Sequence, residues 1–294
     1  MGDSGQSVPG ASLCLPPSPV KRALRTPLAR DACDCHFHVF APEDQFPLVS
    51  ARGYTPHPCS YETYRAAATG LGIERAVLVQ PSVYGYDNAL LVETLRSDRA
   101  RLRGIAVIAP NTSIAQLTEL HEAGVRGLRI NLCQPGLSSL TDIGVLGPKI
   151  AKLGWHFQLH LDISQVAGLE SIVRNSAVPI VIDHFGMISS RATPSALESL
   201  GRLLATRRCW FKLTAPYRCG TERPPYPEVT PLARSLIEHH SDRLVWGTDW
   251  PHPGLHSHMP DDTDLADLLD DWGADTHARE QILVHNPNTL YWHC

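Results

Sequence analysis

Two histidines stand one residue apart in the segment DACDCHFHVF, which begins at residue 31 and is otherwise largely apolar. Side chains alternate between the two faces of a β-strand, so residues two apart point the same way. In a regular strand His36 and His38 therefore share a face with Asp34, and Cys35 and Phe37 share the other. Two imidazoles on a buried strand are either hydrogen-bonded core residues or part of a functional site. The rest of the sequence is needed to decide between these two interpretations.

The elements that position these histidines follow from the pattern beyond residue 30, where apolar segments alternate with segments of helical periodicity. The predicted strands are 33–39, 75–81, 103–109, 125–132, 155–162, 178–185, 209–215 and 244–250. Near-continuous apolar strands that alternate with amphipathic helices predict a parallel sheet covered on its outer face. Eight such units predict an α/β fold of the (β/α)8 TIM barrel type in a single domain. No glycine-rich phosphate-binding loop follows any of these strands, so a nucleotide-binding fold has no support.

Polar and titratable side chains collect where the predicted strands end. In a (β/α)8 barrel the active site lies at these carboxyl ends. The residues in chain order are His36, His38, Gln80, Ser82, Arg129, Asn131, Gln158, His160, Asp162, His184, Lys212, Thr214, Asp249 and His252. This distribution predicts an enzyme rather than a barrel that only binds a ligand, with His252 as a candidate substrate contact.

Four of these residues, His36, His38, His160 and Asp249, have the side-chain types that zinc prefers. A zinc ion would lower the pKa of a bound water to near 7 and supply hydroxide at neutral pH. The alternative is a metal-free histidine cluster that hydrogen-bonds and polarises a substrate carbonyl. The residues themselves leave both readings open.

Cationic side chains also fall at or just beyond the predicted strand ends, although the net charge of the chain is −4. They are Arg126, Arg129, Lys212 and Arg218. A cationic mouth in an acidic protein predicts a small anionic ligand. Alternatively, Arg126 packs outward and Arg218 is a solvated loop residue. Arg129 shares a face with Asn131 in a buried strand, which favours a binding role.

Composition excludes several other functions. The net charge gives no sign of binding to nucleic acid or an anionic membrane, and no apolar run is long enough to span a bilayer. Eight cysteines without a C-x-x-C pair predict reduced thiols and a cytoplasmic location. Residues 1–30, with five prolines and four basic residues, predict a disordered or extended N-terminal tail before a barrel over 31–294. A homo-oligomer is left open.

Five segments, DCHFHVF, QPSVYGYDN, GVRGLRINL, IDHFG and LVWGTDWPHP, together resemble motifs of the amidohydrolase superfamily. The resemblance is to its amidohydrolase-2 branch, which contains 2-pyrone-4,6-dicarboxylate lactonase, 4-sulfomuconolactone hydrolase and related sugar lactonases, and it runs from about residue 31 to 293. It implies hydrolysis of a carboxylated or sulfonated lactone from the degradation of aromatic compounds, by attack of water on the ring carbonyl.

The resemblance also implies roles for individual residues. Asp249 would act as the base, while His36, His38 and His184 would polarise the carbonyl. The residues implied to bind the substrate are Arg129, Arg126, Tyr54, Ser82, Tyr217 and Arg218. The branch contains both metal-free and zinc enzymes, and His160 stands at the strand position that a metal requires, which favours zinc.

The sequence leaves three other functions open. A sugar-acid lactonase or lactone isomerase would prefer hydroxyl-rich substrates, and a zinc-dependent decarboxylase of the same superfamily would release carbon dioxide. A barrel that only binds its ligand is disfavoured by the combination of acid, base and histidines at the strand ends.

Overall fold

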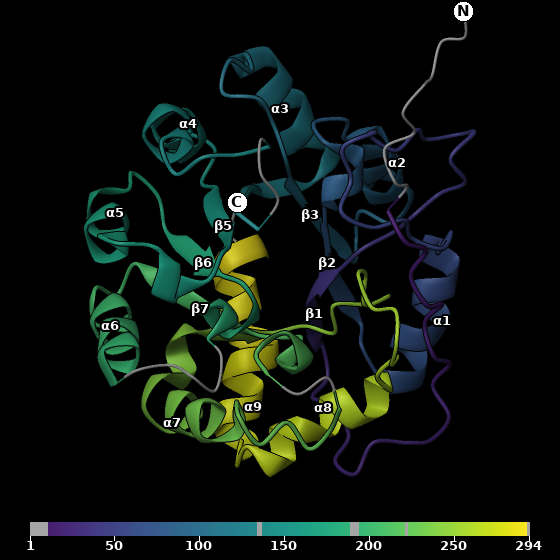
Figure 1. The fold of residues 1–294 in the computed structure, drawn as a ribbon, viewed down its shortest axis with the longest axis vertical. Helices are drawn as coiled ribbons and strands as arrows, with labels where there is room; N and C mark the ends of the chain where they lie inside the picture. The colour runs from purple at the N-terminus through teal and green to yellow at the C-terminus, as the bar shows by residue number, and fades with distance from the viewer. Residues whose placement is uncertain (1–10, 134–136, 189–193, 221–222, 293–294) are drawn as a thin grey trace, which may run out of the picture.

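The computed structural model describes residues 11–133, 137–188, 194–220 and 223–292. Within them, eight parallel strands form one sheet in chain order (Figure 1). The strands are β1 (Cys33–Phe37), β2 (Arg75–Val79), β3 (Leu102–Ala106), β4 (Val125–Asn131), β5 (His156–His160), β6 (Ile180–Ile182), β7 (Cys209–Leu213) and β8 (Leu244–Trp246). The residues after β8 return to β1, where the amide of Asp249 donates to the carbonyl of His36 at 2.8 Å and the amide of His38 to the carbonyl of Trp250 at 2.8 Å. The predicted (β/α)8 fold is confirmed.

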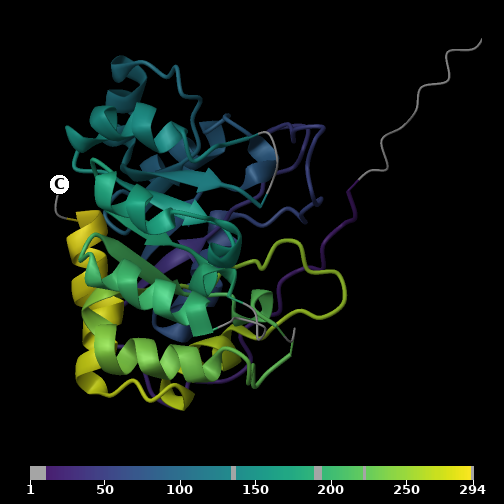
Figure 2. The ribbon, with the colours of Figure 1, turned by 60° about the vertical axis from the view of Figure 1, so that its left-hand side comes forward.

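Helices surround the sheet on its outer side (Figures 1 and 2). They are α1 (Tyr61–Leu71), α2 (Ala89–Ser97), α3 (Ile114–Ala123), α4 (Asp142–Ala151), α5 (Leu169–Asn175), α6 (Pro194–Ala205), α7 (Thr230–His240), α8 (Asp262–Asp271) and α9 (Thr276–Glu280), followed by the π-helical segments Gln281–His285 and Asn288–Trp292. Local sequence sets their ends. In α3, for example, Ser113 and Gln116 form a capping box at the start, and Gly124 ends the helix in the left-handed conformation with φ 115°.

Apolar residues form two separate cores. The larger core lies between the sheet and the helices, where Tyr64 of α1 stacks on Phe37 of β1 with ring centroids 3.7 Å apart. The smaller core fills the barrel interior. Its members are Cys33, Cys35, Val77, Val79, Ile105, Val181, Trp210 and Val245, closed off by Leu290 and Tyr291 of the C-terminal segment. The buried ring of His156 of β5 also lies against this core, with its centroid 5.1 Å from that of Tyr291.

A β-bulge changes the predicted faces of the first strand. The register of β1 against β2 shifts between Asp34 and Phe37. A bulge inserts one extra residue and breaks the strict alternation of side chains. The expectation that Asp34 shares a face with His36 is therefore wrong, because Asp34 accepts from Tyr64 Oη on the helix side at 2.9 Å. Cys35 points instead into the interior core, on the same side of the strand as His36.

The strands end earlier than the sequence predicts. The predicted strand 178–185 corresponds to Ile180–Ile182, and 244–250 to Leu244–Trp246. At both ends the chain turns sharply, since His184 has φ 51° and Asp249 has φ 64°. Left-handed backbone cannot continue a strand, so the functional residues stand on turns that the apolar pattern does not reveal.

The described part of the N-terminal segment, residues 11–30, lies against the outside of the barrel. Near the mouth, the amide of Cys14 donates to the carbonyl of Thr55 at 2.8 Å. Farther along, Arg22 forms ion pairs with Asp264 at 2.6 Å and with Asp267 at 2.7 Å on α8. Residues 1–10 of the predicted tail lie outside the described residues. Among the helices of the described part, none has the length and apolar character needed to cross a membrane.

Candidate active site

A cavity of about 380 Å³ opens at the carboxyl ends of the strands. Nine of the residues that the sequence nominates line it: His38, Tyr54, Ser82, Arg129, Asn131, His160, His184, Arg218 and Asp249. It is also lined by Arg52, Cys133 and His256, among others. The strand ends thus bring together most of the predicted site residues in one concave space, as expected of a (β/α)8 enzyme.

Asp249 lies at the centre of the histidine cluster. Its Oδ1 atom is 3.5 Å from Nε2 of His36, 3.6 Å from Nε2 of His38 and 4.0 Å from Nε2 of His184. Within the described part of the chain, Oδ1 accepts no hydrogen bond although it is buried. One carboxylate oxygen therefore faces three imidazoles without a committed donor.

The other oxygen of Asp249 is fully occupied. Oδ2 accepts from Tyr217 Oη at 2.7 Å, from Arg218 Nη2 at 2.9 Å and from Arg218 Nε at 3.2 Å. Hydrogen bonds that involve an ionised partner are among the strongest in proteins. These three fix the orientation of the carboxylate and leave Oδ1 as its available oxygen.

The backbone at the site is strained. Asp249 and His184 both have positive φ, at 64° and 51°. Non-glycine residues adopt this conformation at a cost of order 1–3 kcal/mol, and it persists only where surrounding contacts enforce it. At Asp249 the enforcing contacts include its amide bond to the carbonyl of His36.

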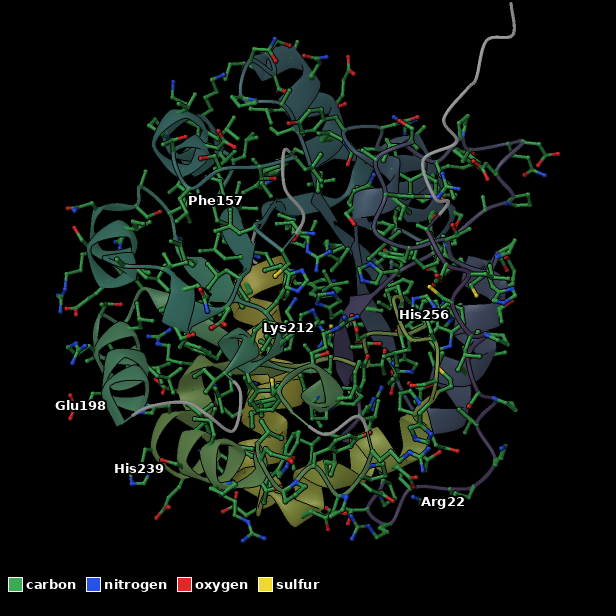
Figure 3. All side chains as sticks on the ribbon, viewed as in Figure 1. Arg22, Phe157, Glu198, Lys212, His239 and His256 are labelled. Carbon is green, nitrogen blue, oxygen red and sulfur yellow. The ribbon has the colours of Figure 1, made fainter. Side chains whose placement is uncertain are left out.

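A buried ionic cluster lies beneath His36. Lys212, which is fully buried, donates to the carbonyl of Cys35 at 2.9 Å and to Oε1 of Gln158 at 2.8 Å, and it pairs with Oδ1 of Asp183 at 3.2 Å. Sequence reasoning placed Lys212 at the cationic mouth, but its side chain points into the barrel below the cavity, near the centre of the view in Figure 3. Unpaired buried charges are costly, so Lys212 and Asp183 stabilise one another.

Burial and charge shift the ionisation of these groups in consistent directions. Burial alone would raise the pKa of Asp249, but Arg218 and the neighbouring imidazoles hold this pKa well below its usual range. Lys212, His36 and Arg129 do the same for the pKa of Asp183 against its burial. Burial, aided by Lys212, lowers the pKa of His36 to about 3. The carboxylates are therefore ionised and this imidazole neutral at physiological pH.

A hydrogen bond fixes which nitrogen of His38 carries the proton. His38 Nδ1 lies 2.7 Å from the carbonyl of Val79, which can only accept, so Nδ1 holds the hydrogen and Nε2 has a free lone pair. Burial lowers the pKa of His38, which favours this neutral form. Nδ1 of His36 lies 3.3 Å from Nζ of Lys212, which can only donate, and 3.5 Å from Oδ1 of Asp183, which can only accept, so these contacts do not fix the tautomer of His36.

The residues present fit a bound cation. Groups with ligand atoms within 4.8 Å of one another include His36, His38 and Asp249, and also His36, Asp183 and His184, within the residues that the structure describes. Two ligands of one tetrahedral zinc lie about 3.4 Å apart, given bond lengths of about 2.0–2.1 Å. The 3.5 and 3.6 Å separations between Asp249 Oδ1 and the two imidazole nitrogens are close to this value.

The predicted fourth ligand, His160, lies in neither group. Its Nδ1 is 3.3 Å from Nη2 of Arg129, and a guanidinium can only donate. In neutral His160 the proton is therefore on Nε2, a buried atom that makes no hydrogen bond to any described residue. Burial, with Arg129 second, holds the pKa of His160 well below its usual range. His160 thus offers an N–H donor rather than a lone pair.

Three of the remaining predicted residues lie away from the cavity surface. Tyr217 and His252 are buried behind Asp249, with Tyr217 Oη 3.0 Å from Nδ1 of His252. Arg126 stands at the opposite end of β4, where Nη1 donates to the carbonyls of His121 at 3.1 Å and Val125 at 2.7 Å. Side chains three apart on β4 point to different faces, which explains why Arg129 reaches the cavity and Arg126 does not.

Sequence reasoning missed several residues of the site. Arg52 and His256 come from the loops after β1 and β8, and His256 is marked in Figure 3. Nothing in the periodicity of a loop indicates which of its side chains faces inward. Asp183 could have been predicted from the sequence, because it directly precedes His184 at the end of an apolar strand.

The sequence profile of the family described as Amidohydrolase matches residues 33–292. This chain belongs to the amidohydrolase family. Within the family, it is 33% identical to 4-sulfomuconolactone hydrolase of Hydrogenophaga intermedia, over 98% of this chain and 97% of that one. It is also 33% identical to 2-pyrone-4,6-dicarboxylate hydrolase of Comamonas testosteroni, over 94% of each chain.

A solved structure of the same family has a similar fold. It is the probable 2-pyrone-4,6-dicarboxylic acid hydrolase of Acinetobacter baumannii with citric acid bound, at 25% identity and a TM-score of 0.79. The match covers 89% of this chain and 99% of that one.

Proposed function

We propose that this protein hydrolyses a lactone that carries an anionic substituent, a carboxylate or a sulfonate. The observation that carries the proposal is the available oxygen of Asp249, which faces three imidazoles in a cavity that also contains Arg52, Arg129 and Arg218. The names of the relatives, a 4-sulfomuconolactone hydrolase and a 2-pyrone-4,6-dicarboxylate hydrolase, support the same class of substrate.

In the proposed reaction Asp249 Oδ1 takes a proton from the attacking water. A carboxylate that acts as general base must be ionised, within reach of the water and free of other donors. The low pKa of Asp249 and the lack of a hydrogen bond to Oδ1 within the described residues meet these conditions. The water then forms a bond to the ring carbonyl carbon, and the ring C–O bond breaks. The proton held by Asp249 passes to the departing ring oxygen to give a hydroxyl group, and the new carboxylic acid releases its proton to solvent to give a carboxylate.

A zinc ion is the candidate cofactor of this reaction. His36, His38 and Asp249 would hold it, since each offers a ligand atom within 4.8 Å of the others, and His184 lies next to them. When bound, zinc would lower the pKa of the attacking water toward neutrality. His160, with its proton on Nε2, is placed to donate a hydrogen bond to a substrate oxygen, a role distinct from that of a ligand.

Anionic groups of the substrate would be bound by the arginines of the cavity. Arg129 has a single close contact to a carboxylate, at 3.5 Å from Asp183, and its Nε makes no hydrogen bond to any described residue. Tyr54 and Ser82 line the same cavity and are proposed contacts for the remaining polar atoms.

The test is a panel of lactones assayed for proton release and for carbon dioxide. The proposal predicts that 4-sulfomuconolactone or 2-pyrone-4,6-dicarboxylate is opened with proton release, and that a neutral lactone of similar ring size reacts much more slowly. Carbon dioxide release would identify a decarboxylase. A preference for neutral, hydroxyl-rich sugar lactones would replace the anionic substrate with a sugar-derived one.

A further inference from the structure

Three buried side chains lie in a row behind Asp249. Tyr217 Oη contacts Asp249 Oδ2 at 2.7 Å and His252 Nδ1 at 3.0 Å, and His252 Nε2 lies 3.2 Å from Oδ1 of Asp262. Tyr217, His252 and Asp262 have exposed fractions of 3%, 0% and 2%. None of them lines the cavity.

The chemistry of Asp249 sets the direction of the two hydrogen bonds that Tyr217 makes. Oδ2 of ionised Asp249 can only accept, so the single hydroxyl hydrogen of Tyr217 points to it. The contact between Tyr217 and His252 then requires a hydrogen on Nδ1 of the imidazole. The carboxylate of Asp262 lies 3.2 Å from the other nitrogen of the ring, although neither atom makes a hydrogen bond to any described residue. His252 thus orients the hydroxyl of Tyr217, Tyr217 orients Oδ2 of Asp249, and Asp262 packs against the far side of the imidazole.

We infer that Tyr217, His252 and Asp262 are positioning residues, which hold Asp249 so that Oδ1 and not Oδ2 faces the three histidines. This inference rests on the proposed role of Asp249. It also assigns Tyr217 and His252 a role other than the substrate contact that their sequence positions suggest. Arg218 also binds Oδ2 of Asp249, but its side chain is 21% exposed and lines the cavity. It is therefore not counted among the positioning residues.

The position of Asp262 explains how the row is anchored. It is the first residue of α8, directly after the N-cap residue Asp261, whose side chain accepts from the amide of Thr263. A carboxylate at a helix N-terminus is stabilised by the helix dipole. The row therefore connects the end of β8 to the start of the helix that follows it.

The test compares Tyr217→Phe and Asp262→Asn with a matched control, Tyr61→Phe. Tyr61 Oη donates to Oδ2 of Asp98 at 2.9 Å on the outside of the barrel, so the control removes the same kind of bond away from the cavity. Loss of an outer partner of a ligand typically costs 10–100-fold in activity or metal affinity. We expect kcat for the anionic lactone to fall roughly 10- to 100-fold in Tyr217→Phe, with KM within about threefold of the wild type.

Three further measurements separate positioning from general stability. The double variant with Asp262→Asn should lose no more than Tyr217→Phe alone, because residues that act as a unit are not additive. His252→Asn, which keeps an N–H donor near Tyr217, should retain more activity than His252→Leu. The dissociation constant for zinc alone, measured by calorimetry, should rise in Tyr217→Phe and stay unchanged in Tyr61→Phe.

The outcomes distinguish this inference from the proposed function. A rise in KM at constant kcat would make Tyr217 a substrate contact, and equal losses of kcat in Tyr61→Phe would make its role structural. Either result overturns the inference. If the wild-type protein opens no lactone, the proposed function fails, and the zinc titration alone decides whether the row positions Asp249.

Discussion

At the carboxyl ends of the strands, the barrel interior holds charged groups that are almost fully withdrawn from water, including Asp183, Lys212 and Asp249. At the other end it holds apolar side chains, such as Ile105 and Val245, together with the buried imidazole of His156 against the ring of Tyr291. Both ends are equally buried, so burial alone does not predict chemistry. Among the described residues of the barrel interior, buried charge gathers at the end where the cavity opens, as expected when ionic groups serve binding and catalysis. Other buried carboxylates, such as Asp34 and Asp262, lie outside that interior, toward the helices.

The largest effect is expected from Asp249→Asn. An amide of the same shape keeps the packing but cannot take a proton from water. A positioned general base contributes typically 10²–10⁴-fold, and we expect kcat to fall by roughly that factor. Steady-state kinetics with circular dichroism as the folding control checks this. If the variant kept the wild-type kcat, another residue would have to be the general base, and His184 is the next candidate.

Removal of metal tests the same end of the barrel. We expect the purified protein to contain close to one zinc or similar divalent ion per chain, measured by elemental analysis. Chelation should lower kcat by roughly 10²–10³-fold, in line with the several kcal/mol that a Lewis acid supplies. Full activity in a strong chelator, in protein without transition metal, would favour the histidine cluster as a metal-free polarising group.

A smaller and more selective effect is expected from Arg129→Met. A hydrogen bond to a charged group is worth about 1.5–3 kcal/mol, so kcat/KM for an anionic lactone should fall roughly 10- to 150-fold. A neutral lactone of the same ring size should be far less affected. Since Arg129 also contacts Asp183 and His160, the ratio between the two substrates is the measurement that isolates substrate binding.

Arg126→Met is the matched control from the other end of the same strand. Because its guanidinium donates to backbone carbonyls of His121 and Val125 away from the cavity, we expect kcat/KM within about twofold of the wild type for both lactones. Equal losses in the Arg126 and Arg129 variants would show that neither arginine selects substrate charge.

The apolar end is expected to affect stability and not catalysis. Ile105 is fully buried in the interior core, and Ile105→Ala should lower the free energy of unfolding by about 2–5 kcal/mol. The kcat of the folded protein should stay close to the wild-type value. Denaturant unfolding and activity measured on the same sample check this. A selective loss of kcat without loss of stability would show that the two ends are coupled.

The barrel and the general place of the site could be predicted because both depend on periodic patterns. Apolar strands alternate with helices, and polar groups such as His36 and His38 fall where strands end. The β-bulge in β1 could not be predicted, because one extra residue between Asp34 and Phe37 leaves the composition of the strand unchanged.

Errors at individual residues have similar physical origins. Lys212 is predicted to lie at the mouth of the barrel because it is a cation near the end of a predicted strand. Its ion pair with Asp183 instead holds it inside the barrel. Tyr217 and His252 follow their strands on turns, and turn geometry directs them behind Asp249. Arg52 and His256 belong to loops, where sequence position does not determine direction.

The most direct test of the central claim is hydrolysis of an anionic lactone in water enriched in ¹⁸O, with mass spectrometry of the product. Attack of water on the ring carbonyl predicts one ¹⁸O atom in the new carboxylate of each product molecule formed in a single turnover. An isomerised product without label, or a product that has lost carbon dioxide, would contradict the account.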